Sequence, residues 1–202
     1  MIRVLVNEVE ADVVCEENLR FVSLVELIKS QIDPEHMITA INVDGCELTE
    51  EQWNMSIGEF KGEELQFYTG NPDQYVVDRV QSAPGVIRTC FFEFRGARKE
   101  FQDGDNREGN QRLKVACDTL RAFFDWYGTL VQIASQPKRE KLDISQQVGE
   151  ISETCKKICE QQLYQSWWAL GESLEKDLEP QLDKLEDMCR RAARQVTAIS
   201  PC

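Results

Sequence analysis

The chain changes character at one place, the run Gly70-Asn71-Pro72-Asp73. Residues 1–70 contain 15 acidic and 4 basic residues, a net charge of −11, whereas residues 71–202 contain 21 acidic and 19 basic residues, a net charge of −2. The spacing of apolar residues also changes there, from alternation to a helical repeat. Gly, Asn, Pro and Asp in succession are typical of a turn. The sequence therefore predicts an α+β chain of two domains, residues 1–70 and 73–202, and we expect the first to fold alone.

The beginning of the first domain has the pattern of a hairpin followed by a helix. Apolar residues alternate over residues 2–6, which predicts a half-buried strand, and Val13-Val14-Cys15 is the expected partner strand. Ser23 and Glu26 have the spacing of a capping box, in which each side chain accepts a hydrogen bond from a free backbone amide. We expect this helix to stop at Asp33-Pro34.

The rest of the first domain carries hairpin and turn signals. Asp44-Gly45 is a strong signal for a tight hairpin between two short strands. Thr49 and Gln52 can cap another brief turn, and residues 64–68 alternate as a last strand. The expected order is ββαβ, a short turn and a final strand.

Three segments carry a resemblance to a known family: Ile41 to Leu48 (INVDGCEL), Ser56 to Phe60 (SIGEF) and Leu65 to Tyr68 (LQFY). In element order and apolar spacing they resemble the second half of a ubiquitin-like β-grasp domain, which implies that fold for residues 1–70. The family's modifiers end in a free diglycine, whereas here the last strand continues into Gly70-Asn71-Pro72, so conjugation is not expected. Asn42 stands where ubiquitin has part of an apolar recognition patch, so ubiquitin's own partners are not expected either.

The second domain has a helical apolar period throughout, and no known family is recognised in it. The first two runs are separated by Asp103-Gly104-Asp105-Asn106, and the second ends at Ser135-Gln136-Pro137, since proline is unfavourable inside a helix. Two more runs follow, which Gly171 or residues 177–180 can divide. Four helices with short links predict an all-α antiparallel four-helix bundle. The four runs span residues 87–101, 113–134, 142–174 and 178–196.

Eight cysteines without a signal peptide indicate reduced thiols rather than a disulfide framework. Cys90, Cys117, Cys155 and Cys189 fall on apolar helical faces, where cysteine behaves as a small hydrophobe. Cys155 and Cys159 form the one close pair, but a structural zinc site needs four ligands. We therefore expect no metal, no cofactor and no required disulfide, and we expect Cys202 to be exposed and open to oxidation.

The sequence offers no recognisable catalytic motif. His36 is the single histidine, no nucleophile motif accompanies it, and no glycine-rich phosphate loop follows a predicted strand. The chain is therefore not expected to be an enzyme. The alternative is a small cytoplasmic enzyme or a metal or redox protein that uses Cys155, Cys159 and His36.

Composition narrows the classes of partner. A pI near 4.6 argues against general nucleic-acid binding, because phosphate needs a concentrated basic surface. No apolar run approaches the roughly 18–20 residues that span a bilayer, and residues 1–6 are too short for a signal peptide. A cytoplasmic protein that binds neither membrane nor nucleic acid is expected.

The adjacent aromatic residues point to protein binding. Trp167 and Trp168 lie about 100° apart on a helix, so both cannot face one core. Phe92 and Trp126 pose the same problem beside Phe91 and Tyr127. A wide apolar face, or the contact between the domains, can absorb these rings; alternatively they form a partner or dimer surface, where aromatic residues are enriched. The apolar stripe of Leu163, Trp167, Leu170 and Leu174 favours Trp168 as the outward ring.

Cations gather where helices are expected to end, which the helix macrodipole favours. The other interpretation is docking against the acidic first domain. Two clusters of three carry these charges: Arg190, Arg191 and Arg194 in the last run, and Arg95, Arg98 and Lys99 in the first.

Together these features favour a non-catalytic interaction protein. We expect an adaptor, an assembly factor or a protein similar to secretion or flagellar-export chaperones, with a protein partner or self-association as a homodimer. The candidate partner-binding residues are Trp167, Trp168, Phe92 and Trp126.

Overall fold

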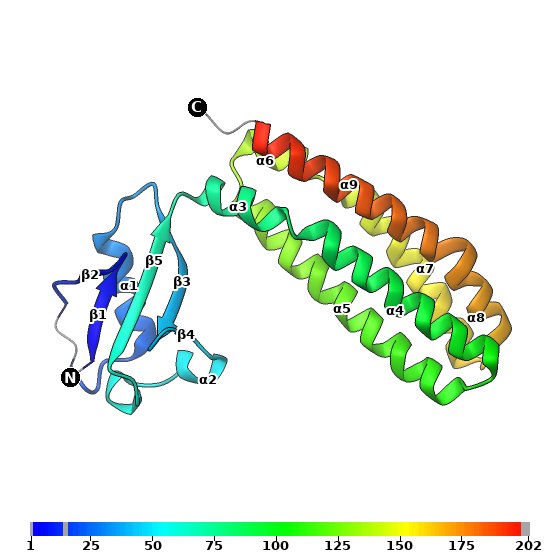
Figure 1. The fold of residues 1–202 in the computed structure, drawn as a ribbon, viewed down its shortest axis with the longest axis horizontal. Helices are drawn as coiled ribbons and strands as arrows, with labels where there is room; N and C mark the ends of the chain where they lie inside the picture. Colours follow the sequence, from blue (N-terminus) through cyan, green and yellow to red (C-terminus); the bar gives the residue numbers. More distant parts are fainter. Residues whose placement is uncertain (1, 14–15, 199–202) are drawn as a thin grey trace. The chain divides into compact units, whose positions relative to one another are not determined.

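The computed structural model describes residues 2–13 and 16–198, and in them the chain is a mixed α+β protein (Figure 1). It divides into two compact units, Met1–Tyr75 and Val76–Cys202. The first contains a five-stranded sheet and the second is helical. The helix α3 (Pro72–Val80) crosses the boundary between them.

The sheet of the first unit has the strand order β2-β1-β5-β3-β4. The neighbouring strands β1 (Arg3–Val6) and β5 (Glu64–Gly70) run parallel. All other pairs are antiparallel and involve β2 (Val9–Glu10), β3 (Met37–Val43) and β4 (Cys46–Glu47). The first and last strands therefore lie side by side in the middle of the sheet.

The partner of β1 is not where the sequence placed it. The hairpin closes at Asn7 and Glu8, both with positive φ, and pairs β1 with Val9–Glu10. Asparagine adopts this backbone region readily, and the Asn7 side chain also donates to Thr69 Oγ1 at 2.8 Å. The expectation for Val13-Val14-Cys15 was therefore wrong at Val13, which is in no strand. Val14 and Cys15 lie outside the described residues.

The second hairpin follows the prediction. Asp44 and Gly45 have φ of 48° and 79°, which a two-residue turn between β3 and β4 requires. The Asp44 carboxylate accepts from the backbone amides of Glu63 and Glu64 at 3.0 and 2.9 Å, which fixes the hairpin to the start of β5.

Of the two α-helices described in the first unit, α2 (Glu50–Trp53) begins at the predicted cap and α1 (Phe21–Gln31) does not. α1 begins after Arg20, and Ser23 lies inside its first turn, so the Ser23–Glu26 capping box was wrong. The start at Phe21 lets a large ring enter the core. α2 has the predicted Thr49–Gln52 box, and a 3-10 turn, η1 (Ile57–Glu59), follows.

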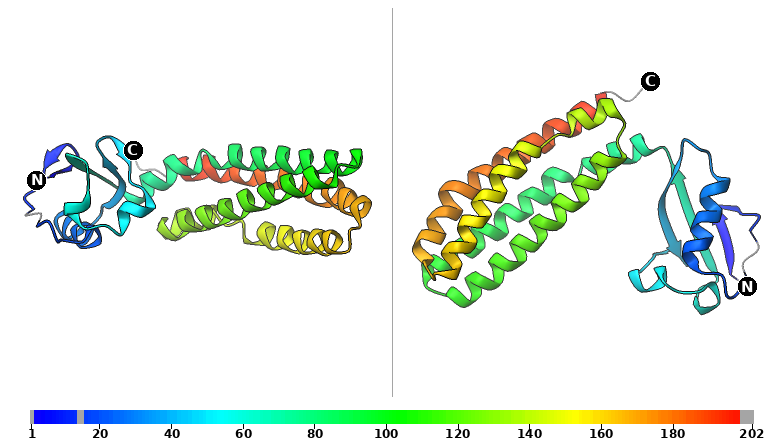
Figure 2. Two further views of the ribbon diagram at one scale, coloured as in Figure 1. Left: turned by 90° about the horizontal axis from the view of Figure 1, so that it is seen from below. Right: turned by 180° about the vertical axis from the view of Figure 1, so that it is seen from behind.

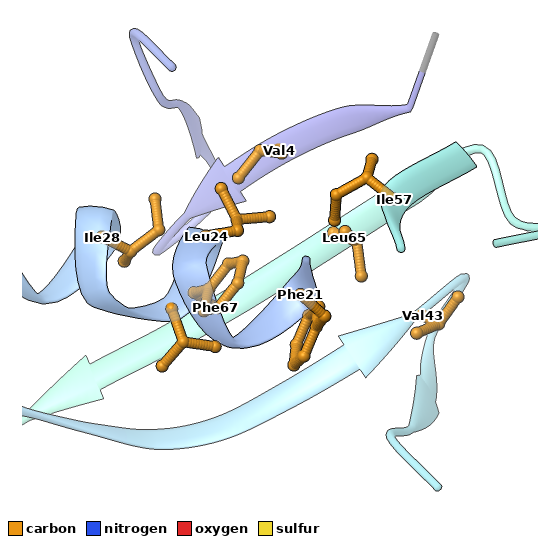
Figure 3. Packing of buried hydrophobic residues seen from close by; sticks show 9 residues of the cluster. Val4, Phe21, Leu24, Ile28, Val43, Ile57, Leu65 and Phe67 are labelled. Atoms are coloured by element: carbon orange, nitrogen blue, oxygen red, sulfur yellow. The ribbon is translucent and has the colours of Figure 1, made fainter. Parts of the chain in front are cut away.

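One core lies between α1 and a single face of the sheet (Figure 3). The rings of Phe21 and Phe67 lie with centroids 6.2 Å apart in a stacked arrangement. The helix contributes Phe21, Leu24, Val25 and Ile28; the strands contribute Val4, Val43, Leu65 and Phe67; the 3-10 turn adds Ile57.

The second unit is built from long helices that run back and forth (Figure 2). α4 packs closely along both α5 and α9, and α7 packs along α8 and α9. After α3 the elements are α4 (Ala83–Asp103), α5 (Asn106–Ile133), α6 (Gln136–Lys141), α7 (Ser145–Leu163), α8 (Trp167–Ser173), the π segment η2 (Leu174–Leu178) and α9 (Glu179–Ala198).

Two predicted helix boundaries are confirmed. α4 ends at Gly104, whose φ of 86° is left-handed, and Asp105 caps α5 by accepting from the Glu108 amide. α5 ends before Ser135-Gln136-Pro137, and Pro137 lies in the first turn of α6.

The last two predicted runs divide differently. The run 142–174 is broken after Leu163, Gly171 is buried inside α8, and the chain stays helical from α8 through η2 into α9. Leucines four residues apart drift by about 40° each around an α-helix. The wider π turn reverses this drift, so that one side stays in the core. All four of Leu170, Leu174, Leu178 and Leu182 are fully buried.

Candidate protein-interaction surface

α7 and α8 meet at a tight corner formed by Tyr164, Gln165 and Ser166. The Ser166 amide donates to Gln161 O at 2.8 Å and the Gln165 amide donates to Gln162 O at 3.0 Å. These two bonds make a Schellman motif, which satisfies the last carbonyls of a helix. Gln165 holds the left-handed position with φ of 54°, where glycine is usual. No glycine therefore marks this corner in the sequence.

Three large apolar side chains stand out from this corner, and we call them the corner patch: Leu163, Tyr164 and Trp168. Their exposed fractions are 77%, 76% and 77%. Trp168 is thus the outward indole, as the apolar stripe favoured. Leu163 was expected inside that stripe, and this was wrong: α7 ends at Leu163, so the chain turns away before its side chain can reach the core.

Trp167 faces inward. Its ring stacks on Phe101 with centroids 5.4 Å apart and an angle of 8° between the planes. Gly109 makes room for Phe101, because a Cβ at residue 109 would lie 2.9 Å from two Phe101 ring atoms. The two consecutive indoles therefore have different surroundings, one packed and one in solvent.

A buried ion-pair network stabilises the helices behind the corner. Arg98 Nε donates to Glu179 Oε1 at 2.7 Å, and its Nη1 donates to Glu175 Oε1 at 3.0 Å. Arg98 and Glu179 are both buried. Arg98 was expected as a cation near a helix end, where the macrodipole favours it; in the structure it is buried within α4 and joins this helix to η2 and α9.

Phe92 and Trp126 belong to separate aromatic clusters. Phe92 is 53% exposed, and the Arg88 guanidinium lies 4.8 Å from its ring centroid. Trp126 is half-buried, with its ring centroid 5.8 Å from that of Phe123. Of the four predicted binding residues, only Trp168 belongs to the corner patch. Sequence reasoning missed Tyr164, whose exposure depends on the corner.

Four of the thiols on the helices of the second unit are poorly suited to nucleophilic chemistry. Burial raises the pKa of Cys90 and Cys155 to about 11, and that of Cys117 and Cys189 to about 12. Since the thiolate is the reactive form, these groups stay inert near neutral pH. Cys90 and Cys189 are buried as expected, whereas Cys117 and Cys155 are half-buried.

The residues of the alternative reading are placed in different units. His36 lies in an exposed loop of the first unit, whereas Cys155 and Cys159 lie on α7. Across residues 2–13 and 16–198, no group of three or more His, Cys, Asp or Glu side chains is arranged to hold a metal ion. Cys202 lies outside the described residues.

Neither a membrane span among the described helices nor a known relative points to a function for this chain. Among the described helices, none combines the length and apolarity needed to cross a bilayer. No family model, no curated protein and no solved structure significantly matches this chain. The inference of function therefore depends on the geometry of the corner patch itself.

Proposed function

We propose that this chain is a non-catalytic protein-interaction protein, an adaptor, assembly factor or export-type chaperone, whose helical unit binds a partner protein through the corner patch. The observation that carries the proposal is the exposure of Leu163, Tyr164 and Trp168, each about three-quarters in solvent within six consecutive residues. Single exposed apolar residues are ordinary, but a contiguous group is typical of an interaction site.

The composition of the corner patch suits this role. Trp and Tyr are enriched among residues that dominate binding energy, because a large ring fills a partner's pocket and carries a polar group at its edge. Tyr and Trp have few rotatable bonds, so ordering them on binding costs little conformational entropy.

The support beneath the patch also favours binding. Trp167, next to Trp168, stacks on Phe101 of α4, and Arg98 of the same helix pairs with Glu175 and Glu179 in the segments that follow α8. A surface held by buried contacts loses less freedom on association than a mobile loop does.

We further propose that the first unit is a ubiquitin-like β-grasp domain and that the second is an antiparallel four-helix bundle. Support for the first comes from the central parallel pair β1–β5 and the single helix on one sheet face. Support for the second comes from the long helices α4, α5, α7 and α9. The β-grasp unit, with its net charge of −11, would add an acidic protein-binding module.

A cytoplasmic location fits this proposal. The six cysteines that the structure describes in detail are all free thiols, and Cys46 and Cys159 are exposed. Exposed thiols persist where the glutathione and thioredoxin systems keep them reduced.

Affinity capture with the full chain as bait tests the proposal. Wild type and Trp168→Ala are immobilised side by side, with Val115→Ala as the matched control, since Val115 is also a half-exposed apolar residue but lies on α5. We expect a protein that wild type and the control retain and that Trp168→Ala loses. Equal retention by all three baits, or turnover of a substrate by the purified chain, would contradict the proposal.

A further inference from the structure

The helices α5 and α7 run in opposite directions: the start of α5 is bonded to the end of α7, and the end of α5 lies across a cleft from the start of α7. Near the corner, the Gln162 side-chain amide of α7 donates to Asn110 Oδ1 of α5 at 2.6 Å, which joins the two helices there. Towards the other end, at the last turns of α5, a cleft of about 670 Å³ lies between the two helices. Small-molecule sites in proteins have volumes of about 300–1,000 Å³.

The walls of this cleft are predominantly apolar. Phe124 and Val131 of α5 face Val148 of α7, and Leu142 and Ile144 come from the link between α6 and α7. Gly128 lies among them without a side chain, and a Cβ built there meets nothing within 4 Å. The space above Gly128 is therefore open, and a larger residue at 128 would occupy it.

The charged groups at the cleft disfavour an anionic ligand. Arg139 lines the cleft, but its guanidinium already donates to three carbonyl oxygens at the end of α5, those of Val131, Gln132 and Ala134. Two carboxylates also line it, Glu140 and Asp143. Hydrogen bonds from Ser145 lower the pKa of Asp143, which keeps it charged near neutral pH. An anion would meet two carboxylates against one guanidinium, whose Nε and Nη2 donors are already used by backbone carbonyls.

One residue of the cleft lining has a buried hydroxyl that no described residue pairs with. Tyr127 lines the cleft, and its hydroxyl is buried with no hydrogen-bond partner among the described residues. Burial raises the Tyr127 pKa well above its usual value, so the group stays a neutral donor. The hydroxyl is covered in the unliganded structure, so a ligand in the cleft pairs with it only if the side chains that cover it move aside. A buried hydroxyl without a partner is costly, which favours such a move.

We propose that the cleft between α5 and α7 binds an uncharged, predominantly apolar small molecule that carries a hydrogen-bond acceptor for the Tyr127 hydroxyl. The apolar walls supply most of the affinity, and the single donor orients the ligand. This site is separate from the corner patch, so either proposal can fail while the other stands.

Nile red is a suitable probe, because it is uncharged, largely apolar and carries a carbonyl acceptor, and its fluorescence rises in apolar surroundings. It is titrated with the full wild-type chain and three variants. Gly128→Leu fills the cleft, and we expect it to weaken binding at least tenfold. Tyr127→Phe removes the donor alone, and we expect a loss of about fivefold. Gly149→Leu is the matched control on α7, also with open space around the new Cβ, and it should bind as wild type does.

The outcomes separate the alternatives. Absence of saturable binding to wild type, or wild-type affinity in Gly128→Leu, overturns the proposal, since the dye would then bind elsewhere, for example at the corner patch. Wild-type affinity in Tyr127→Phe overturns the role of the hydroxyl. Sedimentation velocity covers the remaining occupant: if Gly128→Leu converts a wild-type dimer into a monomer, a second copy fills the cleft and the proposal is wrong.

Discussion

The two ends of the helical unit differ in two respects: whether their large apolar side chains are exposed or line a hollow, and which buried polar groups are paired. At the corner end, Leu163, Tyr164 and Trp168 point into solvent, while the buried charges of Arg98 and Glu179 are paired. At the cleft end, apolar side chains line a hollow, and the buried Tyr127 hydroxyl is unpaired. One end therefore combines a buried ion pair with an exposed apolar surface, and the other combines a buried hydroxyl, unpaired among the described residues, with a recessed apolar surface.

This contrast suggests that the two ends have different roles, one in binding a protein and the other in binding a small molecule. The buried Arg98–Glu179 ion pair stabilises the corner end, which suits the presentation of side chains to a partner, although Gln161 Oε1 there is buried without a hydrogen-bond partner among the described residues. An unsatisfied group at the cleft end stores free energy that a ligand can recover. Substitutions at the two ends should therefore have different consequences.

The largest expected effect is at the corner end. Arg98→Ala leaves the buried Glu179 carboxylate without its partner, and we expect the free energy of unfolding to fall by about 3–5 kcal/mol. Urea denaturation measures it. Arg121→Ala is the control, because its pair with Asp118 is exposed, and it should cost less than about 1 kcal/mol. Equal effects of the two variants would show that the corner end has no special rigidity.

Gly109→Ala should disturb the packing under the corner by a smaller amount. The new Cβ would lie 2.9 Å from the Phe101 ring and would displace it from Trp167. We expect a loss of about 1–3 kcal/mol, as for other overpacked cores. Gly149→Ala, which has open space, should instead gain about 0.5–1 kcal/mol from the lower flexibility of the unfolded chain. Thermal denaturation of both variants checks the difference in sign.

The sequence predicted the elements that depend on local signals and missed those that depend on packing. Asp44-Gly45 and the Thr49–Gln52 box were correct because a turn and a cap are determined within four residues. The Ser23–Glu26 box was wrong because burial of Phe21 shifted the helix start. Such competition with the core is not visible in a four-residue pattern.

The same distinction applies to the candidate site. The 100° geometry of consecutive helical residues predicted that Trp167 and Trp168 would differ, and the apolar stripe indicated which ring turns outward. The exposure of Leu163 and Tyr164 could not be predicted, because it depends on the left-handed backbone conformation of Gln165, which glutamine rarely adopts. The cleft could not be predicted from the sequence either, since it depends on how far apart α5 and α7 lie.

Alkaline pH should act on the cleft end, where Cys189 is buried in α9. Its pKa is about 12, raised by burial, against 9.0 for the free thiol. The folded chain keeps this proton where the unfolded chain has lost it, so the contribution is complete below pH 9 and is lost as the pH rises towards 12. We expect about 1 kcal/mol less stability from this thiol at pH 10 than at pH 9.

Urea denaturation at both pH values, with reductant present, measures this loss. Cys189→Ala should show a shallower decline than wild type. An identical decline would mean that this thiol does not contribute to the alkaline loss of stability.

The smallest expected effect concerns the corner backbone. Gln165→Gly relieves the left-handed strain at φ of 54° but makes the unfolded chain more flexible, so we expect a gain of about 0.5 kcal/mol. Glu160→Gly, within α7, should instead lose about 1 kcal/mol. Differential scanning calorimetry resolves the two signs, and a loss in both variants would argue against strain at Gln165.

The most direct test of the corner patch is the affinity of Trp168→Ala for the captured partner, or for a second copy if the chain self-associates. We predict a loss of about 30-fold, which corresponds to about 2 kcal/mol, with the melting temperature unchanged because the indole is exposed. Trp167→Ala serves as the reference and should lower the melting temperature by removing the stack on Phe101. Wild-type affinity in a fully folded Trp168→Ala variant would contradict the role of the corner patch.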